Sequence, residues 1–166
     1  MKIQQQHNSD LTLLSEMIEG ISVGMLTNIN EHGALTSRPM TPLEMDSEGS
    51  LWFFIDRTSV PSPERLSDIN LAFSDEDRAV YVSLSGRGEL DDSREIVRRL
   101  WTSFAKPWFP EGPESPDLAL LKFVPETAEY WDGPHSKVVR KVAMAASIAA
   151  GRPIGIGEHH TLTNLS

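Results

Sequence analysis

The sequence predicts a mainly β protein, an antiparallel barrel with peripheral helices. Six or seven short segments are rich in β-branched and aromatic residues or alternate apolar with polar positions. Turn signals such as EHG (31–33) and DSEGS (46–50) separate several of them. Helical segments fall between the strands without a repeating β-α-β rhythm, and this order disfavours a doubly wound parallel sheet.

The first element is a helix over residues 10–20, because apolar side chains recur there at a spacing of three or four. Asp10 is its expected N-cap, and Gly20 its stop. The next segments share strand-forming residues and bounding turns, and they cover residues 23–30, 34–45, 51–56, 70–75 and 80–90.

A short helix over residues 64–70 interrupts these strands, after RTSVPSPERL (57–66), a serine- and proline-rich turn that looks like a helix start. A helix from about 92 to 103 is expected next, followed by a proline-rich surface loop at 105–117. Two strands are expected within 117–132, with a break at Pro125. The last expected element is a helix at 137–151, which ends at Gly151.

Length and composition limit the possible classes of protein. The 166 residues suit one domain, with a core at about 10–157 and polar tails at both ends. The net charge of −9 argues against binding of nucleic acid or an anionic membrane, since both need basic surface. The sequence has no cysteine, no signal peptide and no apolar run of membrane-spanning length, so we expect a cytoplasmic protein without disulfides.

Common catalytic and metal motifs are missing. The sequence has no nucleophile elbow, and the adjacent His159 and His160 lack the i, i+4 spacing of a helical metal pair. Paired acidic residues fall in turns, where solvated charge is the expected role. SGRGEL (85–90) lacks the third glycine of a dinucleotide fingerprint and continues as a strand.

Two polar signals lie inside otherwise apolar strands. TSRPM (36–40) places Arg38 in mid-strand, where it needs a carboxylate or phosphate partner, and Pro39 indicates an edge or a bulge. EYWDGPHSK (129–137) places Trp131 at a strand end, ahead of Lys137. An internal salt bridge for Arg38 and a core position for Trp131 are equally compatible with these residues.

Taken together, four segments resemble the general stress protein 26 family. They are GMLTNINEHGALTSRPM, LWFFIDRTS, YVSLSGRGELDD and AKPWFPEGPESPDLALLKFVPETAEYWDGPHSKVV. That family belongs to the FMN-binding split barrels that are like pyridoxamine 5′-phosphate oxidase. The resemblance implies a six-stranded antiparallel split barrel that forms a homodimer, with two flavin sites at the interface.

The resemblance also implies roles for individual residues toward FMN, with FAD as the alternative flavin. Arg38 matches the arginine that reaches the phosphate or ribityl chain, and Ser59 the serine of a phosphate-binding S-x-K turn. The resemblance implies that Pro39, Met40, Phe54 and Ile55 line the ring edge with backbone groups and that Trp108 adds a wall. Trp131 and Lys137 match the tryptophan and basic residue of the partner chain that close over the ring.

The sequence departs from the family pattern at two places. Val60 and Pro61 replace the residues that complete the S-x-K turn, and losing that lysine costs on the order of 1.5–3 kcal/mol of phosphate binding. Arg57 and Arg65 are the candidates to substitute in part for the lysine, although neither occupies the motif position. KVVRK (137–141) stands where true pyridoxamine phosphate oxidases carry R-x-H-x-R, so oxidation of vitamin B6 is not expected.

The sequence therefore leaves three functions open. The first is a flavin-binding general stress protein with weak flavin-dependent oxidoreductase activity. The second is a non-enzymatic flavin-binding, sensor or stress-interaction protein. The third is a barrel dimer that holds no flavin and binds a partner through its surface, including the loop at 105–117.

Overall fold

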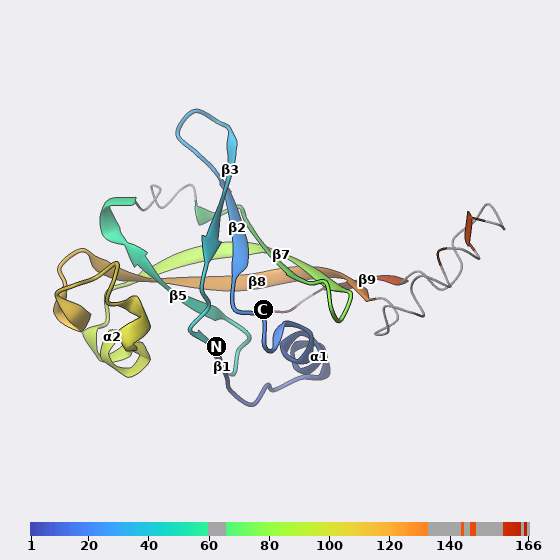
Figure 1. The fold of residues 1–166 in the computed structure, drawn as a ribbon, viewed down its shortest axis with the longest axis horizontal. Coiled ribbons are helices and arrows are strands. Elements are labelled where there is room, and N and C mark those ends of the chain that lie inside the picture. Colours follow the sequence, from blue (N-terminus) through green and yellow to red (C-terminus); the bar gives the residue numbers. More distant parts are fainter. Residues whose placement is uncertain (60–65, 133–143, 145–146, 149–157, 164, 166) are drawn as a thin grey trace.

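The strands form one open sheet. The structure, a computed structural model, describes residues 1–59, 66–132, 144, 147–148, 158–163 and 165. Nine strands of this part follow the order β1-β4-β5-β8-β7-β6-β2-β3, with β9 paired to β8 (Figure 1). Their bounds are Lys2–Ile3 (β1), Gly24–Ile29 (β2), Leu35–Met40 (β3), Glu44–Met45 (β4), Leu51–Asp56 (β5), Ile69–Asp75 (β6), Val80–Asp91 (β7), Leu118–Asp132 (β8) and Glu158–Thr163 (β9).

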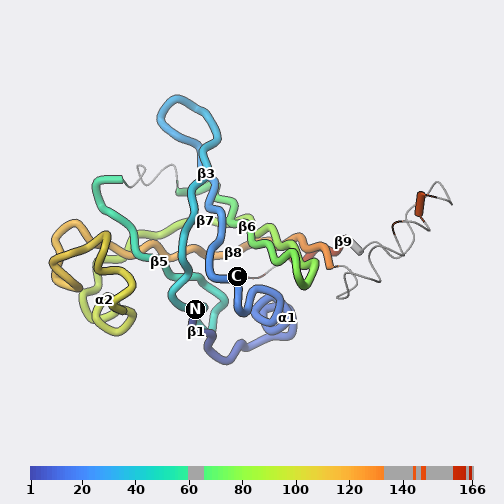
Figure 2. The backbone as a smooth tube through the Cα atoms, viewed as in Figure 1, coloured from blue at the N-terminus to red at the C-terminus, as the bar shows by residue number. Residues whose placement is uncertain are grey.

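The expected mainly β, split-barrel architecture is confirmed. All pairings are antiparallel except that of β1 with β4, and the path of strands does not close within the described residues. Seven strands have six or more residues, namely β2, β3, β5, β6, β7, β8 and β9, whereas the resemblance implies six. In Figure 2 the β2–β3 hairpin projects beyond the rest of the sheet.

Side chains alternate between a buried inner face and an exposed outer face along β2, β6, β7 and the second half of β8. The inner face holds the main core, whose fully buried members include Leu26, Phe53, Leu71, Leu84, Leu121 and Phe123. The outer face carries polar side chains together with several exposed apolar ones. This alternation is the usual pattern of an antiparallel sheet with one covered face.

β5 and the first half of β8 are covered on both faces. The main core covers one face, and helix α2 (Arg94–Leu100) covers the other through a second cluster that includes Trp52, Val97 and Phe109. Burial on both sides explains why LWFFID (51–56) is apolar at nearly every position. The expected strand at 51–56 is confirmed at both ends.

Helix α1 covers Ser9–Ile18, and its N-cap differs from the expected one. The Asn8 side chain, not that of Asp10, accepts a hydrogen bond from the backbone N–H of Leu11, at 2.8 Å. Asn8 lies three residues before this donor, which is the capping distance, whereas Asp10 already belongs to the first turn. The guanidinium of Arg78, in the β6–β7 turn, donates to carbonyl oxygens near the end of α1. These hydrogen bonds connect the helix to that turn.

The predicted break at Pro125 is wrong, because β8 continues through it. Pro125 lies opposite Gly86, at a register shift between Ser85 and Gly86. A bulge has a place for a residue without an N–H, so the proline is accommodated inside the strand. A Cβ on Gly86 would lie 2.1 Å from the carbonyl oxygen of Val124, so the close approach of the strands requires glycine here.

The other differences concern element ends. The expected strand at 34–45 is divided into β3 and β4, and the expected helix at 92–103 ends at Leu100 because Trp101 has extended backbone angles. Single 3-10 turns follow at Ser103–Ala105 and Gly112–Glu114 within the expected loop. The expected helix at 64–70 is wrong over its described part, because residues 67–68 form a bend and β6 already begins at Ile69. Most of the expected helix at 137–151 lies outside the described residues.

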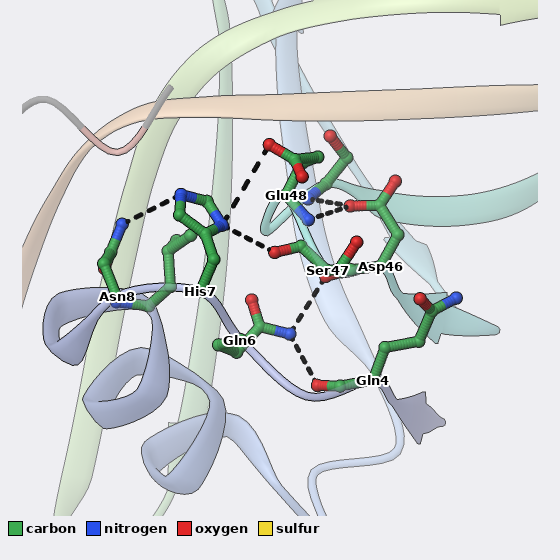
Figure 3. Close-up of polar contacts among 9 residues, drawn as sticks. Gln4, Gln6, His7, Asn8, Asp46, Ser47 and Glu48 are labelled. Carbon is green, nitrogen blue, oxygen red and sulfur yellow. Dashed lines mark hydrogen bonds and ion pairs between the residues drawn. The ribbon is translucent and has the colours of Figure 1, made fainter.

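The N-terminal segment is hydrogen-bonded to the turn between β4 and β5. The Gln6 amide donates to the backbone oxygens of Gln4 and Asp46, at 2.7 and 2.9 Å. The His7 ring is hydrogen-bonded through Nδ1 to the Ser47 oxygen at 2.8 Å (Figure 3). Because β1 pairs with β4, this polar tail is part of the sheet. No helix in the described residues has the length and hydropathy needed to cross a membrane, and a cytoplasmic location stays a prediction.

Candidate ligand site at the split of the barrel

The open strand edges that concern the site belong to β3 and β5. β3 ends the path of the sheet and pairs only with β2. β5 pairs with β8 along its whole length, but β4 covers its second edge only at Leu51 and Trp52. The split of the barrel is thus bordered by β3 and by the second half of β5.

The ladder of β5 directs the backbone of Phe54 toward this open edge. Arg57 N donates to Asp117 O at 2.8 Å on the β8 side, whereas Trp52 O accepts from Leu43 N at 2.8 Å on the other side. Backbone groups alternate between the two edges of an antiparallel strand, so Phe54 N–H and C=O point away from β8. The Ile55 backbone points toward Ala119 instead, and its side chain is buried in the core.

The Phe54 side chain takes no part in this edge. Its ring lies 5.8 Å from that of Trp101 and 6.4 Å from that of Phe109, measured between centroids. These contacts place it in the second cluster, against α2. Phe54 therefore offers only its backbone to a ligand in the split.

Pro39 lies on an edge strand, as its lack of an N–H predicted. Hydrogen-bonded and non-hydrogen-bonded residue pairs alternate along the β2–β3 ladder, and the 2.8 Å hydrogen bond from Asn30 N to Ala34 O shows which pairs are bonded. Arg38 then bonds back to Leu26 through its backbone, while the Pro39 nitrogen and carbonyl point to the open edge. A proline at this position removes no hydrogen bond from the ladder. Met40 follows on the inner face and packs against the main core.

Arg38 has an unsatisfied guanidinium. It lies opposite Leu26, which is fully buried, so both side chains point to the inner face. Its Nε and Nη2 atoms are buried and have no hydrogen-bond partner in the described part of the chain. Burial lowers the pKa of Arg38, yet a guanidinium stays charged at neutral pH. No internal salt bridge to Arg38 is found among the described residues, so this cation is suited to an anionic ligand.

The turn after β5 has fewer hydrogen-bond donors available for a phosphate than the S-x-K motif suggests. The Ser59 hydroxyl donates to the Asp56 carbonyl at 2.8 Å, so its proton is already used. The Thr58 side chain and N–H donate to the Asp56 carboxylate, and these bonds lower the pKa of Asp56. Arg57 is held by Asp92. Residues 60–65, with Val60, Pro61 and Arg65, lie outside the described part.

The residues predicted to cover the ring from the partner chain or as a wall stay predictions. Trp131 is on the outer face of β8, opposite Tyr81, and 40% of its surface is exposed. Trp108 is 71% exposed in the loop after α2. Lys137 lies outside the described residues. Because Arg38 points to the inner face and Trp131 to the outer face, one chain does not bring these two side chains together.

The sequence reasoning missed one element beside Trp131. Residues 158–163, expected in a polar tail, form β9 and pair with the end of β8. The His159 ring stacks on Trp131, and the His160 ring stacks on Tyr130 from the opposite face of the sheet. The signal was the strand propensity of Thr161 and Thr163 on either side of Leu162, which is weak because the segment is short and polar.

These features define a class of protein, an open β-barrel with a cationic, backbone-lined split between two strand edges. Residues 9–154 match the family described as pyridoxamine 5′-phosphate oxidase like, and the chain belongs to this family. The resemblance to the general stress protein 26 group is confirmed by similar solved structures.

Three relatives illustrate the similarity. Protein bli-3 of Neurospora crassa is 26% identical over 145 residues, which cover 81% of this chain and 69% of bli-3. A structure from Jannaschia sp. CCS1, assigned to general stress protein 26, is 28% identical, covers 93% of this chain and 98% of its own, and has a TM-score of 0.69. The general stress FMN/FAD binding protein of Xanthomonas citri is 29% identical, covers 75% and 89%, and has a TM-score of 0.63.

Proposed function

We propose that this protein binds a flavin in the split between β3 and β5, with FMN as the expected flavin and FAD as the alternative. The observation that carries the proposal is the half-buried guanidinium of Arg38, whose buried Nε and Nη2 atoms have no partner in the described structure. A buried cation without a partner is costly, and a phosphate dianion is the kind of group that a guanidinium fork binds well.

The other parts of the split suit a flat ring with a polar edge. Phe54 offers a backbone N–H and C=O, and Pro39 a carbonyl, along the two open edges. Such backbone groups can fix the orientation of a ring without adding charge. The bound flavin would supply electron and hydride transfer, and the residues of the chain would hold it in place.

A homodimer would complete the site. Arg38 and Trp131 point to opposite faces of one sheet, so a second copy is needed to bring a Trp131 to the ligand held by Arg38. The outer face also exposes apolar side chains that a second copy could cover; they are Met25, Ile29, Leu35, Tyr81 and Trp131. Trp108 and Lys137 stay predicted members of the site.

Two roles for the bound flavin follow. In the first, the protein is a weak flavin-dependent oxidoreductase that is not a genuine pyridoxamine phosphate oxidase, since Val139 replaces the histidine of that motif. In the second, it binds flavin without turnover. In both roles the phosphate is held weakly at the turn after β5, where the Ser59 proton and the Arg57 guanidinium are both engaged within the chain.

Titration of FMN fluorescence with the purified protein tests the proposal. The fluorescence should be quenched by the wild-type chain and much less by Arg38→Met. Arg98→Met is the matched control, because Arg98 is exposed and paired with Glu114. FMN that keeps its full fluorescence with the wild type contradicts the proposal. Oxidation of NADH or NADPH by the flavin-loaded protein then separates the two roles.

A further inference from the structure

A histidine and a tryptophan form a stacked pair at the end of the outer face. The His159 ring lies 4.9 Å from the Trp131 ring between centroids, with an angle of 14° between their planes. The two residues are cross-strand partners in the β8–β9 ladder. No other ring contact to Trp131 is present in the described part of the chain.

The pair is partly exposed and has an acidic neighbour. About half of the His159 and Glu129 side chains is accessible, and His159 Nε2 lies 4.0 Å from the Glu129 carboxylate. Glu129 projects from the same face of β8, two residues before Trp131. The imidazole is therefore held between a carboxylate and an indole while its partner ring still reaches the surface.

His159 lies outside the family frame, since the family match ends at residue 154 and β9 begins at Glu158. We propose that His159 is a positioning residue of the flavin site: its ring fixes the indole of Trp131, which then stacks on the flavin of the second copy. This inference rests on the proposed function and adds a residue that the family motifs do not contain.

The physical reason is orientation. An indole at a strand end can rotate about its side-chain bonds, and ordering such a side chain on binding costs affinity. A ring stacked on one face restricts this rotation before the ligand arrives, and aromatic pairs of this kind are worth about twofold to tenfold in an equilibrium constant. The pair thus preorganises the remaining surface of Trp131 for a flat ring.

His160 provides a matched control within the same strand. It stacks on Tyr130 with a centroid distance of 4.9 Å and an angle of 21°. Its neighbour Tyr130 packs on the main core, on the inner face. Replacing His160 therefore removes a comparable ring from β9 without touching Trp131.

The test combines two measurements on the full chain. FMN affinity is measured by fluorescence titration, and the environment of Trp131 by ¹⁹F NMR of protein labelled with 5-fluorotryptophan, assigned with Trp131→Phe. His159→Ala should weaken FMN binding about threefold to tenfold and shift the Trp131 resonance. His159→Phe should keep both near wild type, because it keeps a ring, and His160→Ala should change neither.

Contrary results have distinct meanings. Wild-type affinity in His159→Ala, together with weak binding by Trp131→Ala, overturns the role of His159 and leaves the flavin site standing. Equal losses in His159→Ala and His160→Ala overturn it as well, because they reflect the loss of β9 as a whole. A wild-type chain that does not bind FMN overturns both proposals. If His159→Ala does not fold, His159→Leu gives the same comparison with a better strand former.

Discussion

Arg57 and Asp92 join the turn after β5 to the start of α2 through a two-pronged ion pair. One guanidinium nitrogen of Arg57 lies 3.1 Å from Asp92 Oδ2, and the second nitrogen contacts Oδ1. The pair raises the pKa of Arg57 and lowers that of Asp92. Arg57 is the described arginine nearest to the phosphate turn. Because its guanidinium is paired with the Asp92 carboxylate, its charge is not free for a ligand.

Asp92→Asn should therefore tighten FMN binding. Removing the carboxylate charge releases Arg57 toward the turn, and one added contact to phosphate at an exposed site is expected to raise the affinity by up to about fivefold. Fluorescence titration measures the effect. The gain should vanish in the double variant Arg57→Ala with Asp92→Asn, and an unchanged affinity in Asp92→Asn alone would refute this role of Arg57.

Pro61→Lys tests the departure from the S-x-K turn directly. A lysine two residues after Ser59 restores the charge that the family pattern places there, so FMN should bind roughly 10- to 100-fold more tightly. The same titration at low and high salt gives a second readout, since a phosphate contact weakens with ionic strength. A surface that binds no flavin would not respond to this substitution.

Arg38→Met should change stability and binding in opposite directions. The flavin-free protein loses an unsatisfied buried cation, so its free energy of unfolding should rise by about 1 kcal/mol. FMN binding should weaken about 10- to 100-fold, because the phosphate loses its guanidinium partner. Urea unfolding with and without FMN measures both effects, and lower stability of the flavin-free variant would contradict this account of Arg38.

Met25→Arg should convert the proposed dimer to monomers. Met25 lies on the outer face opposite Pro39 and Ala72, and a charge buried in an interface without a partner is strongly unfavourable. Light scattering coupled to size exclusion measures the mass of the particle. Leu13→Arg is the control, because Leu13 is an exposed apolar residue of α1. A monomeric wild type would exclude the dimer. If Met25→Arg and Leu13→Arg reduced the mass equally, the interface could not be assigned to the outer face of the sheet.

Asp75→Asn should reduce stability at neutral pH and flatten its loss in acid. Hydrogen bonds from the Arg78 backbone and side chain lower the pKa of Asp75. A carboxyl with a lowered folded-state pKa adds stability above its unfolded pKa of about 3.9, and loses it as the pH falls through the folded value. The melting temperature of the wild type should therefore fall more steeply below about pH 4 than that of Asp75→Asn. Parallel curves would contradict this role.

The sequence allowed the architecture to be predicted where burial left a strong pattern. The strand at Leu51–Asp56 was predicted at both ends, because two covered faces make it apolar throughout. Pro125 misled the prediction because β8 has a bulge beside it, where the strand accommodates a residue without an N–H. The Asn8 cap was missed because it depends on one local side-chain hydrogen bond, and β9 because its segment is short and polar.

The candidate site was predicted only in part, for a geometric reason. The motif around Arg38 identified the residue, but its lack of a partner could be recognised only in three dimensions. The opposite directions of Arg38 and Trp131 follow from the register of the five strands from β3 to β8, which a single sequence does not reveal. The engagement of Arg57 by Asp92 links residues 35 positions apart and leaves no local sequence signal.

The proline on the open edge of β3 has a consequence for self-association. An uncovered strand edge is a template on which a strand of another molecule can polymerise. At Pro39 this edge presents a carbonyl but no N–H, so an incoming strand finds no hydrogen-bond donor at this position of the open edge. A compact ligand that needs only single hydrogen bonds is not affected by this gap. Pro39 thus lets the barrel stay open while discouraging fibril-like stacking through its split.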